Sequence, residues 1–199
     1  MTDATPNDPA FWDERYRTGR TAWDCGGVPC ALREYLRQHP GPGRAVVPGC
    51  GSGYELQAFH AAGWDVLGLD FSGAAVAHAR AILGSLADKV VVADFFTHAL
   101  PPGDFDLIYE RTFLCALPPD LWPAYARRMA QLLKPGGALC GFFFFGPEDE
   151  PPPHPVTPGT LASLLGPSFE KIIDETVTDS LPLYAGKERW QVWRRHAAR

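Results

Sequence analysis

Long hydrophobic runs are missing from this 199-residue chain. The longest apolar stretch, residues 138–145, is far shorter than the roughly 20 apolar residues that a membrane-spanning helix needs. The first ten residues are polar and lack the cationic start and apolar middle of a secretory signal. We therefore expect a protein without a membrane partner that works in the cytoplasm.

An excess of positive charge is also missing, because the formal net charge is −5 and the calculated pI is about 5.6. A nucleic-acid partner would require a basic stripe to neutralise phosphates. The concentrated cations are two arginine pairs, at 127–128 and 194–195, which are typical of solvated faces. The charge pattern predicts no nucleic-acid partner.

Metal-ligand spacing is absent as well. The five cysteines form no Cys-x-x-Cys pair and no zinc-type Cys/His cluster, and the six histidines include no His-x-x-x-His pair. We expect no metal, and free, mostly buried thiols. For Cys25 and Cys30 a redox or catalytic role stays open, beside the simpler interpretation as small hydrophobic side chains.

The most informative segment that is present joins an apolar run to a glycine-rich turn. Residues 46–48 (Val-Val-Pro) lead into Gly49, Gly51 and Gly53, and a second apolar run ends at Asp70. Glycines let the backbone turn sharply and approach a ligand where a Cβ would clash. An acid at the tip of the neighbouring strand, about twenty residues on, can accept both hydroxyl hydrogens of a ribose. The pattern predicts a nucleotide site.

The kind of nucleotide follows from the glycine spacing. A dinucleotide loop has the pattern Gly-x-Gly-x-x-Gly, but the third glycine slot holds Tyr54 counted from Gly49 and Leu56 counted from Gly51. The alternating glycines favour a ligand without a pyrophosphate, such as S-adenosylmethionine, over a nicotinamide dinucleotide. A turn without any ligand is the third alternative.

Apolar runs and helical segments alternate along the chain, which predicts an α/β fold with a mostly parallel sheet covered on both faces. We expect a Rossmann-like, seven-stranded sheet in one domain, residues 1–199. Expected strands are 44–48, 65–70, 89–93, 105–110 and 138–145, followed by a closing antiparallel pair, 169–178 and 189–195. Expected helices are 8–16, 30–38, 54–62, 72–83, 120–133 and 158–165.

Two further segments flank the expected site. We expect residues 1–40 to form a helical cap. Residues 146–158 hold six prolines, which exclude helix and ladder pairing. This proline-rich flap follows the carboxyl end of a strand, where open α/β sheets bind ligands. It is either a lid over the acceptor or a simple connector.

Several motifs together resemble the thiopurine S-methyltransferase superfamily, which includes plant and bacterial halide and thiol methyltransferases. The resemblance covers nearly the whole chain. It rests on 11–13 (FWD), 19–24 (GRTAWD), 47–54 (VPGCGSGY), 68–72 (GLDFS), 94–96 (DFF), 105–111 (FDLIYER), 132–137 (LLKPGG) and 186–188 (GKE). It implies a class I methyltransferase fold and S-adenosyl-L-methionine as cofactor, with S-adenosyl-L-homocysteine as product.

The resemblance also implies which residues contact the methyl donor. Trp12, Tyr16 and Trp23 would close over the sulfonium, since aromatic faces attract cations by roughly 0.5 to 2 kcal/mol each. Asp70 would bind the ribose, and Asp94 with Phe95 would meet the adenine. The full expected donor set is Trp12, Tyr16, Trp23, Gly49, Gly51, Gly53, Asp70, Phe71, Asp94, Phe95 and Glu110.

Arg111 is the expected catalytic residue, because it follows the fourth strand, where related enzymes contact the acceptor. Thiopurine enzymes resemble it there, whereas the halide-favouring plant branch commonly has tyrosine. A guanidinium would stabilise an acceptor thiolate. The alternative is a structural arginine paired with Glu110 or Asp106.

We therefore expect methyl transfer to the sulfur of a small-molecule thiol by a monomer. The alternatives are an O- or N-methyltransferase, for which Glu110 is the candidate base, a halide methyltransferase, and a non-enzymatic donor-binding or nicotinamide-binding protein. The acceptor's identity depends on the flap and on the loop 181–186.

Overall fold

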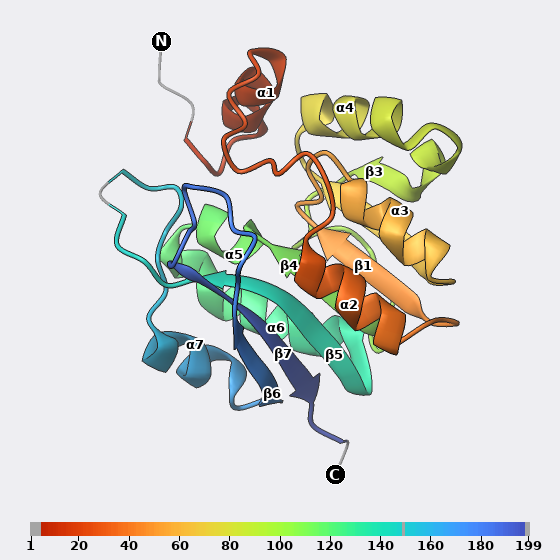
Figure 1. Ribbon diagram of the computed structural model, residues 1–199, viewed down its shortest axis with the longest axis vertical. Helices are drawn as coiled ribbons and strands as arrows, with labels where there is room; N and C mark the ends of the chain where they lie inside the picture. The colour runs from red at the N-terminus through yellow and green to blue at the C-terminus, as the bar shows by residue number, and fades with distance from the viewer. Residues whose placement is uncertain (1–4, 149, 198–199) are drawn as a thin grey trace.

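The computed structural model describes residues 5–148 and 150–197 and is built around one seven-stranded sheet (Figure 1). The strand order is β3-β2-β1-β4-β5-β7-β6, and β7 runs antiparallel to both β5 and β6. The strands are β1 Arg44–Pro48, β2 Asp65–Asp70, β3 Val90–Val92, β4 Phe105–Arg111, β5 Leu133–Phe144, β6 Phe169–Thr176 and β7 Glu188–Arg195. The mostly parallel sheet with a C-terminal antiparallel strand confirms the expected fold class.

The helices alternate with these strands as the sequence predicted. They are α1 Pro9–Arg17, α2 Cys30–Gln38, α3 Tyr54–Ala61, α4 Gly73–Leu83, α5 Phe113–Ala116, α6 Trp122–Leu132 and α7 Pro158–Leu165, with 3₁₀ turns η1 Gly84–Lys89 and η2 Pro119–Leu121. The first residues of α1 and α4 show how the local sequence determines where a helix begins. Asp8 caps α1 by accepting from the Ala10 amide, and Ser72 caps α4 by accepting from the Ala75 amide. Side-chain caps of this kind satisfy amides that have no partner inside the helix.

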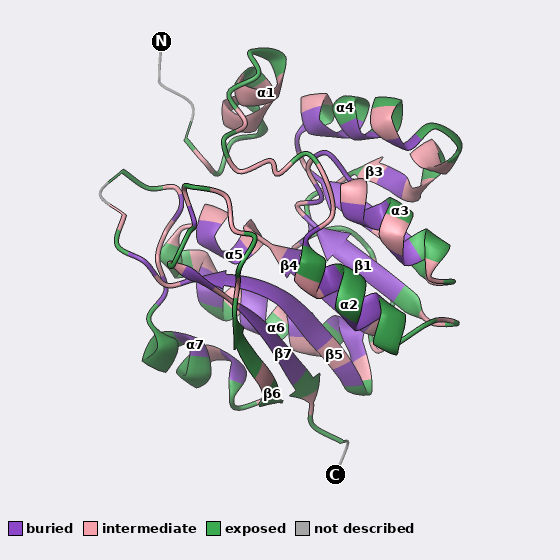
Figure 2. Ribbon diagram, viewed as in Figure 1, coloured by how far each residue is buried: buried purple, intermediate pink, exposed green. Residues whose placement is uncertain are grey.

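Each face of the sheet carries its own helical layer. Residues of α2, α3 and α4 form one core cluster with the sheet, and residues of α5, α6 and α7 form the other. The interior strand β5 is buried along Gly141–Phe144, as its near-continuous apolar sequence requires in a doubly covered sheet (Figure 2). By contrast, α1 lies beside α4 and buries no residue (Figures 1 and 2).

Two features differ most from the expected elements. Strand β5 begins at Leu133, five positions before the expected Ala138, because Phe105 pairs with Leu133 ahead of a register shift and Leu107 then pairs with Ala138. The short helix α5 was not expected. The described residues of the proline-rich flap form neither helix nor strand, as the prolines predicted. Within the described ranges, no helix has the length and apolar content to cross a membrane.

Candidate functional site

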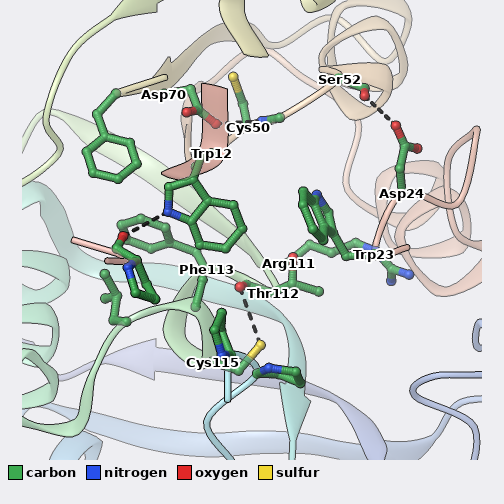
Figure 3. Close-up of a pocket in the computed structure, with 18 of the residues that line it drawn as sticks. Trp12, Trp23, Asp24, Cys50, Ser52, Asp70, Arg111, Thr112, Phe113 and Cys115 are labelled. Carbon is green, nitrogen blue, oxygen red and sulfur yellow. Dashed lines mark hydrogen bonds between the residues drawn. The ribbon is translucent and has the colours of Figure 1, made fainter. Parts of the chain in front are cut away.

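A cavity of about 500 Å³ opens at the carboxyl ends of β1, β2 and β4 (Figure 3). That volume lies in the usual range for small-molecule sites. All the expected site residues line it except Glu110. The cavity is also bounded by the start of α5, by Leu183 and Tyr184, and by four flap residues, Glu148, Glu150, Pro152 and Pro153.

The glycine turn forms the floor of this cavity. Gly49, Gly51 and Gly53 have φ values of 57°, 52° and 73°, a region in which a side chain is strained. A Cβ on Gly49 would lie 2.5 Å from the ring of Phe113, and one on Gly51 would lie 2.6 Å from the Tyr16 hydroxyl. The turn therefore needs glycine both for its backbone conformation and for close approach of the aromatic wall.

Asp70, at the end of β2, has its carboxylate held in place by two backbone amides. Gly51 N–H donates to Oδ2 at 3.0 Å, and Ser72 N–H donates to Oδ1 at 2.9 Å. Burial raises the pKa of Asp70 to about 6, although these two hydrogen bonds oppose the rise. Each oxygen keeps a further lone pair, so the carboxylate can still accept from two ligand hydroxyls.

Aromatic rings from the N-terminal segment cover the glycine turn. The rings of Trp12 and Trp23 meet edge to face at 5.2 Å, and Tyr16 meets Trp23 at 6.1 Å. The Trp12 indole N–H donates to the Pro6 carbonyl at 2.8 Å. Figure 3 shows the two indoles projecting into the space between Asp70 and Arg111. A cationic ligand in that space would meet aromatic surface.

Two aspartates attach this aromatic segment to the nucleotide loops. Asp13 accepts hydrogen bonds from Ser72 Oγ at 2.6 Å and from the Ala74 amide at 3.0 Å, at the start of α4. Asp24 accepts from the hydroxyl of Ser52, inside the glycine turn (Figure 3). Asp13 belongs to α1 and Asp24 to the loop that follows it, so each carboxylate attaches a different part of the segment.

Replacing Asp13 by alanine should loosen α1 from α4. The bonds to Ser72 and Ala74 lower the pKa of Asp13, so the attachment is complete above pH 4 and is lost only at lower pH. We expect a loss of about 1 kcal/mol in stability and faster tryptic cleavage within residues 15–20. Limited proteolysis checks this against Glu14→Ala, which removes only exposed ion pairs of α1. Equal cleavage of both variants would contradict the assignment.

The wall beyond β3 holds the expected adenine contacts. Asp94 Oδ1 accepts from the Phe96 amide at 2.7 Å, and the Asp94 side chain lies at the cavity. Phe95 is buried and meets the ring of Phe113 edge to face at 5.5 Å. Phe71 also lines the cavity. A planar base entering here would find an apolar surface with one carboxylate at its edge.

Arg111 lies at the other end of the cavity, at the end of β4. Its guanidinium stacks 4.5 Å from the centre of the Phe142 ring, and its Nη1 is buried without a hydrogen-bond partner. No carboxylate of the described residues comes within 4 Å of it. Burial opposes its charge, but Tyr109, Glu188 and other nearby acidic groups raise the pKa of Arg111 above its usual value. A charged guanidinium thus faces the cavity without a counter-ion.

The alternative interpretation of Arg111 was an ion pair with Glu110 or Asp106. Neither acid pairs with it in the structure. Asp106 forms its ion pair with Lys134 at 2.8 Å. Side chains alternate along a strand, so positions 106 and 110 point to the face opposite Arg111.

Glu110 is therefore corrected from an expected donor contact to a structural residue. It is not among the residues that line the cavity, and its Oε1 accepts from the amides of Phe113 and Leu114 at 2.8 and 3.1 Å. Burial raises the pKa of Glu110 to about 7. The carboxylate supports the turn from β4 into α5, where Thr112 has a left-handed φ of 57°, a strained value for a β-branched residue.

The two cysteines singled out in the sequence separate in the structure. Cys25 lines the cavity, and its thiol donates to the Gly27 carbonyl at 2.8 Å. Cys30 is exposed and is not part of the cavity wall. Cys50 and Cys115, for which the sequence indicated no role, line the cavity as well.

Sequence reasoning also missed Glu55, Asp24 and Phe113, all of which line the cavity. A signal existed for Glu55, since it directly follows the glycine turn in the first turn of a helix. No local sequence signal marks Asp24, because its contact with Ser52 joins segments far apart in the chain. The loop at 181–186, named as a determinant of specificity, contributes Leu183 and Tyr184.

Comparison with known proteins agrees with this geometry. The family described as "Thiopurine S-methyltransferase (TPMT)" matches residues 7–196. "Probable thiol methyltransferase 2" of Arabidopsis thaliana is 37% identical over 175 residues, covering 83% of this chain and 76% of that protein. "Thiocyanate methyltransferase 1" of Brassica oleracea is 33% identical over 191 residues, covering 92% and 84%.

Among solved structures, a 1,6-didemethyltoxoflavin-N1-methyltransferase from Burkholderia thailandensis superposes with a TM-score of 0.76. The two sequences are 20% identical, and the match covers 98% of this chain and 92% of the other. That crystal structure holds 1,6-didemethyltoxoflavin and S-adenosylhomocysteine. At this identity the likeness shows a shared fold.

Proposed function

The chain belongs to the thiopurine S-methyltransferase family, and from this membership we infer that it transfers a methyl group from S-adenosylmethionine to the sulfur of a small-molecule thiol. It is an S-adenosylmethionine-dependent methyltransferase, an enzyme with a small-molecule substrate. The observation that carries the choice of sulfur is the half-buried guanidinium of Arg111, whose buried Nη1 has no hydrogen-bond partner, at one end of a cavity whose other end holds Asp70.

For the donor, we propose that Asp70 accepts from the two ribose hydroxyls and that Asp94 and Phe95 hold the adenine. The glycine turn, where a Cβ would meet Phe113 or Tyr16, leaves backbone exposed to the amino-acid end. Trp12, Tyr16 and Trp23 would surround the sulfonium, which supplies an electrophilic methyl group. The fit is supported by the aromatic wall and by the free lone pairs of Asp70.

For the acceptor, we propose that Arg111 holds the sulfur as a thiolate. A nearby positive charge lowers a thiol's pKa and so increases the fraction of the nucleophilic form. Transfer from a sulfonium to a thiolate removes two opposite charges, so a dry, aromatic site favours it over water. Described residues of the proline-rich flap line the cavity, which supports a role for the flap as a cover over the acceptor.

A small soft anion is a second candidate acceptor. The unpaired guanidinium would bind such an anion directly, and one relative is named a thiocyanate methyltransferase. Oxygen or nitrogen acceptors have less support, because Glu110, the candidate base for them, points away from the cavity.

The test is turnover with methyl-labelled donor against alkyl and aryl thiols, thiocyanate, iodide, phenols and amines. We expect methylated sulfur and an equal amount of S-adenosylhomocysteine, with phenols and amines unchanged. Methylation of oxygen or nitrogen with none on sulfur would overturn the proposal. Donor binding without any turnover would instead support a binding module.

We also propose that the enzyme works as a monomer in the cytoplasm. The five cysteines are all free thiols, which is typical of a reducing compartment. Large exposed apolar side chains on the described surface are limited to Val92 and Ile172, which supports a chain without a permanent partner.

A further inference from the structure

Glu55 is a buried acid that the proposed chemistry has not yet used. It lies in the first turn of α3, directly after the glycine turn, and lines the cavity while only 8% of its surface is exposed. Its carboxylate accepts one side-chain hydrogen bond among the described residues, from the Tyr109 hydroxyl at a long 3.5 Å from Oε1.

Arg111 occupies the same side of the sheet. It follows Tyr109 by two positions on β4, so both side chains point to the face that α3 covers. The charge of Arg111 lies close enough to lower the pKa of Glu55, yet the two groups form no ion pair within 4 Å. A buried acid and a half-buried guanidinium thus line one cavity without forming an ion pair.

The proposed reaction requires that the acceptor thiol lose its proton and that the resulting negative charge be stabilised. A thiol with an ordinary pKa near 8.5 is mostly protonated at neutral pH, whereas the thiolate is the nucleophile. The acceptor must therefore lose a proton before or during methyl transfer. Arg111 can stabilise the resulting charge, but a guanidinium cannot take up the proton.

We propose that Glu55 is the proton acceptor for the incoming thiol, a role that rests on the proposed function. The S–H proton passes to the Glu55 carboxylate, and the sulfur lone pair forms the new bond to the methyl carbon. The old carbon–sulfur bond breaks, and its electron pair stays on the departing sulfur, which becomes neutral. Glu55 later releases its proton to solvent, so the net products are a thioether, S-adenosylhomocysteine and a proton.

The surroundings of Glu55 suit this role. Burial raises its pKa, while its own backbone amide and Arg111 oppose the rise. A carboxylate with a raised pKa is a stronger base than a free one. The titratable groups that face it are Asp24 and Cys25 of the N-terminal segment, Cys50 and Tyr54 beside it, and Tyr109 and Arg111 of β4.

The experiment replaces Glu55 by glutamine, which keeps the shape and the bond to Tyr109 but cannot take a proton. Two acceptors are compared at pH 7: an alkyl thiol, which arrives protonated, and a nitro-substituted aryl thiol, which arrives ionised. We expect kcat/KM for the alkyl thiol to fall about 100-fold, the usual range for a lost general base, and that for the aryl thiol to change less than about 3-fold. Raising the pH toward 9.5 should restore much of the alkyl-thiol activity, because the thiol then ionises in solution.

The controls separate this role from others. Glu170→Gln removes an exposed carboxylate of β6 and should match the wild type with both thiols. Calorimetry with S-adenosylhomocysteine should give an unchanged affinity. An equal loss with both thiols, or a weakened affinity for S-adenosylhomocysteine, would overturn the proposal in favour of a donor-binding or structural role. If Glu55→Gln does not fold, Glu55→Asp should still prefer the ionised thiol relative to wild type, and an unchanged preference would overturn the proposal.

Failure of the proposed function would look different. A wild-type enzyme that methylates neither thiol would refute sulfur transfer itself. A wild-type enzyme active on both thiols, with Glu55→Gln equally active on both, would refute only the role of Glu55.

Discussion

Replacing Arg111 by alanine should lower kcat/KM for an aryl thiol about 100-fold or more, while the affinity for S-adenosylhomocysteine stays within about 2-fold of wild type. The guanidinium is half-buried with its Nη1 buried and unpartnered, has no counter-ion within 4 Å among the described residues, and lines the cavity. Preorganised charge in a dry site is worth far more than the same charge in water. Its removal should therefore affect the sulfur and leave the donor end of the cavity intact.

Two variants make this result interpretable. Arg111→Lys keeps the charge but loses the planar fork and the stacking on Phe142, so we expect partial activity. Arg127→Ala removes an exposed arginine of α6 and should leave turnover unchanged. Thermal unfolding of each variant shows whether the fold survives. Unchanged turnover in Arg111→Ala would remove Arg111 from the site, and an equal loss of donor affinity would assign it to the donor.

The fold could be predicted closely from the sequence where local signals dominate. The glycine turn after β1, the caps at Asp8 and Ser72, and the alternation of apolar and helical segments each act within a few residues. The start of β5 could not be predicted, because residues 134–137 (Lys-Pro-Gly-Gly) read as a turn. They lie within the strand only through a register shift against β4, which is a long-range pairing.

The site was predictable to the extent that residues follow strand ends. Asp70 and Arg111 end β2 and β4, so both had to lie at the same edge of the sheet. Glu110 was misplaced although the alternation along β4 could have shown that neighbouring side chains point to opposite faces. The contacts of Asp13 and Asp24 depend on how the N-terminal segment docks onto α4 and the glycine turn, and nothing in the local sequence encodes that docking.

Replacing Asp70 by alanine should weaken binding of S-adenosylhomocysteine about 10- to 100-fold, with a smaller effect on turnover at saturating donor. The expected loss corresponds to hydrogen bonds to a charged group, each worth roughly 1.5 to 3 kcal/mol. The variant also leaves the amides of Gly51 and Ser72 without their acceptor, so Asp70→Asn is the better-matched replacement. Asp88→Ala, an exposed acid in η1, serves as the control. Calorimetry showing undiminished affinity in Asp70→Ala would refute the assignment.

The pH dependence of donor binding tests the same carboxylate without a mutation. Burial raises the pKa of Asp70 to about 6 in the free protein. Hydroxyl donors favour the ionised form, so bound ligand should lower this pKa and binding near pH 6 should release a proton. The affinity for S-adenosylhomocysteine should therefore be full above pH 7 and fall as the pH drops through 6. Below pH 6 the fall should approach about tenfold per pH unit. Asp70→Asn carries no such proton and should bind with a much flatter pH profile. A wild-type affinity that does not change between pH 5 and 7 would mean that the ionised Asp70 does not hold the ligand.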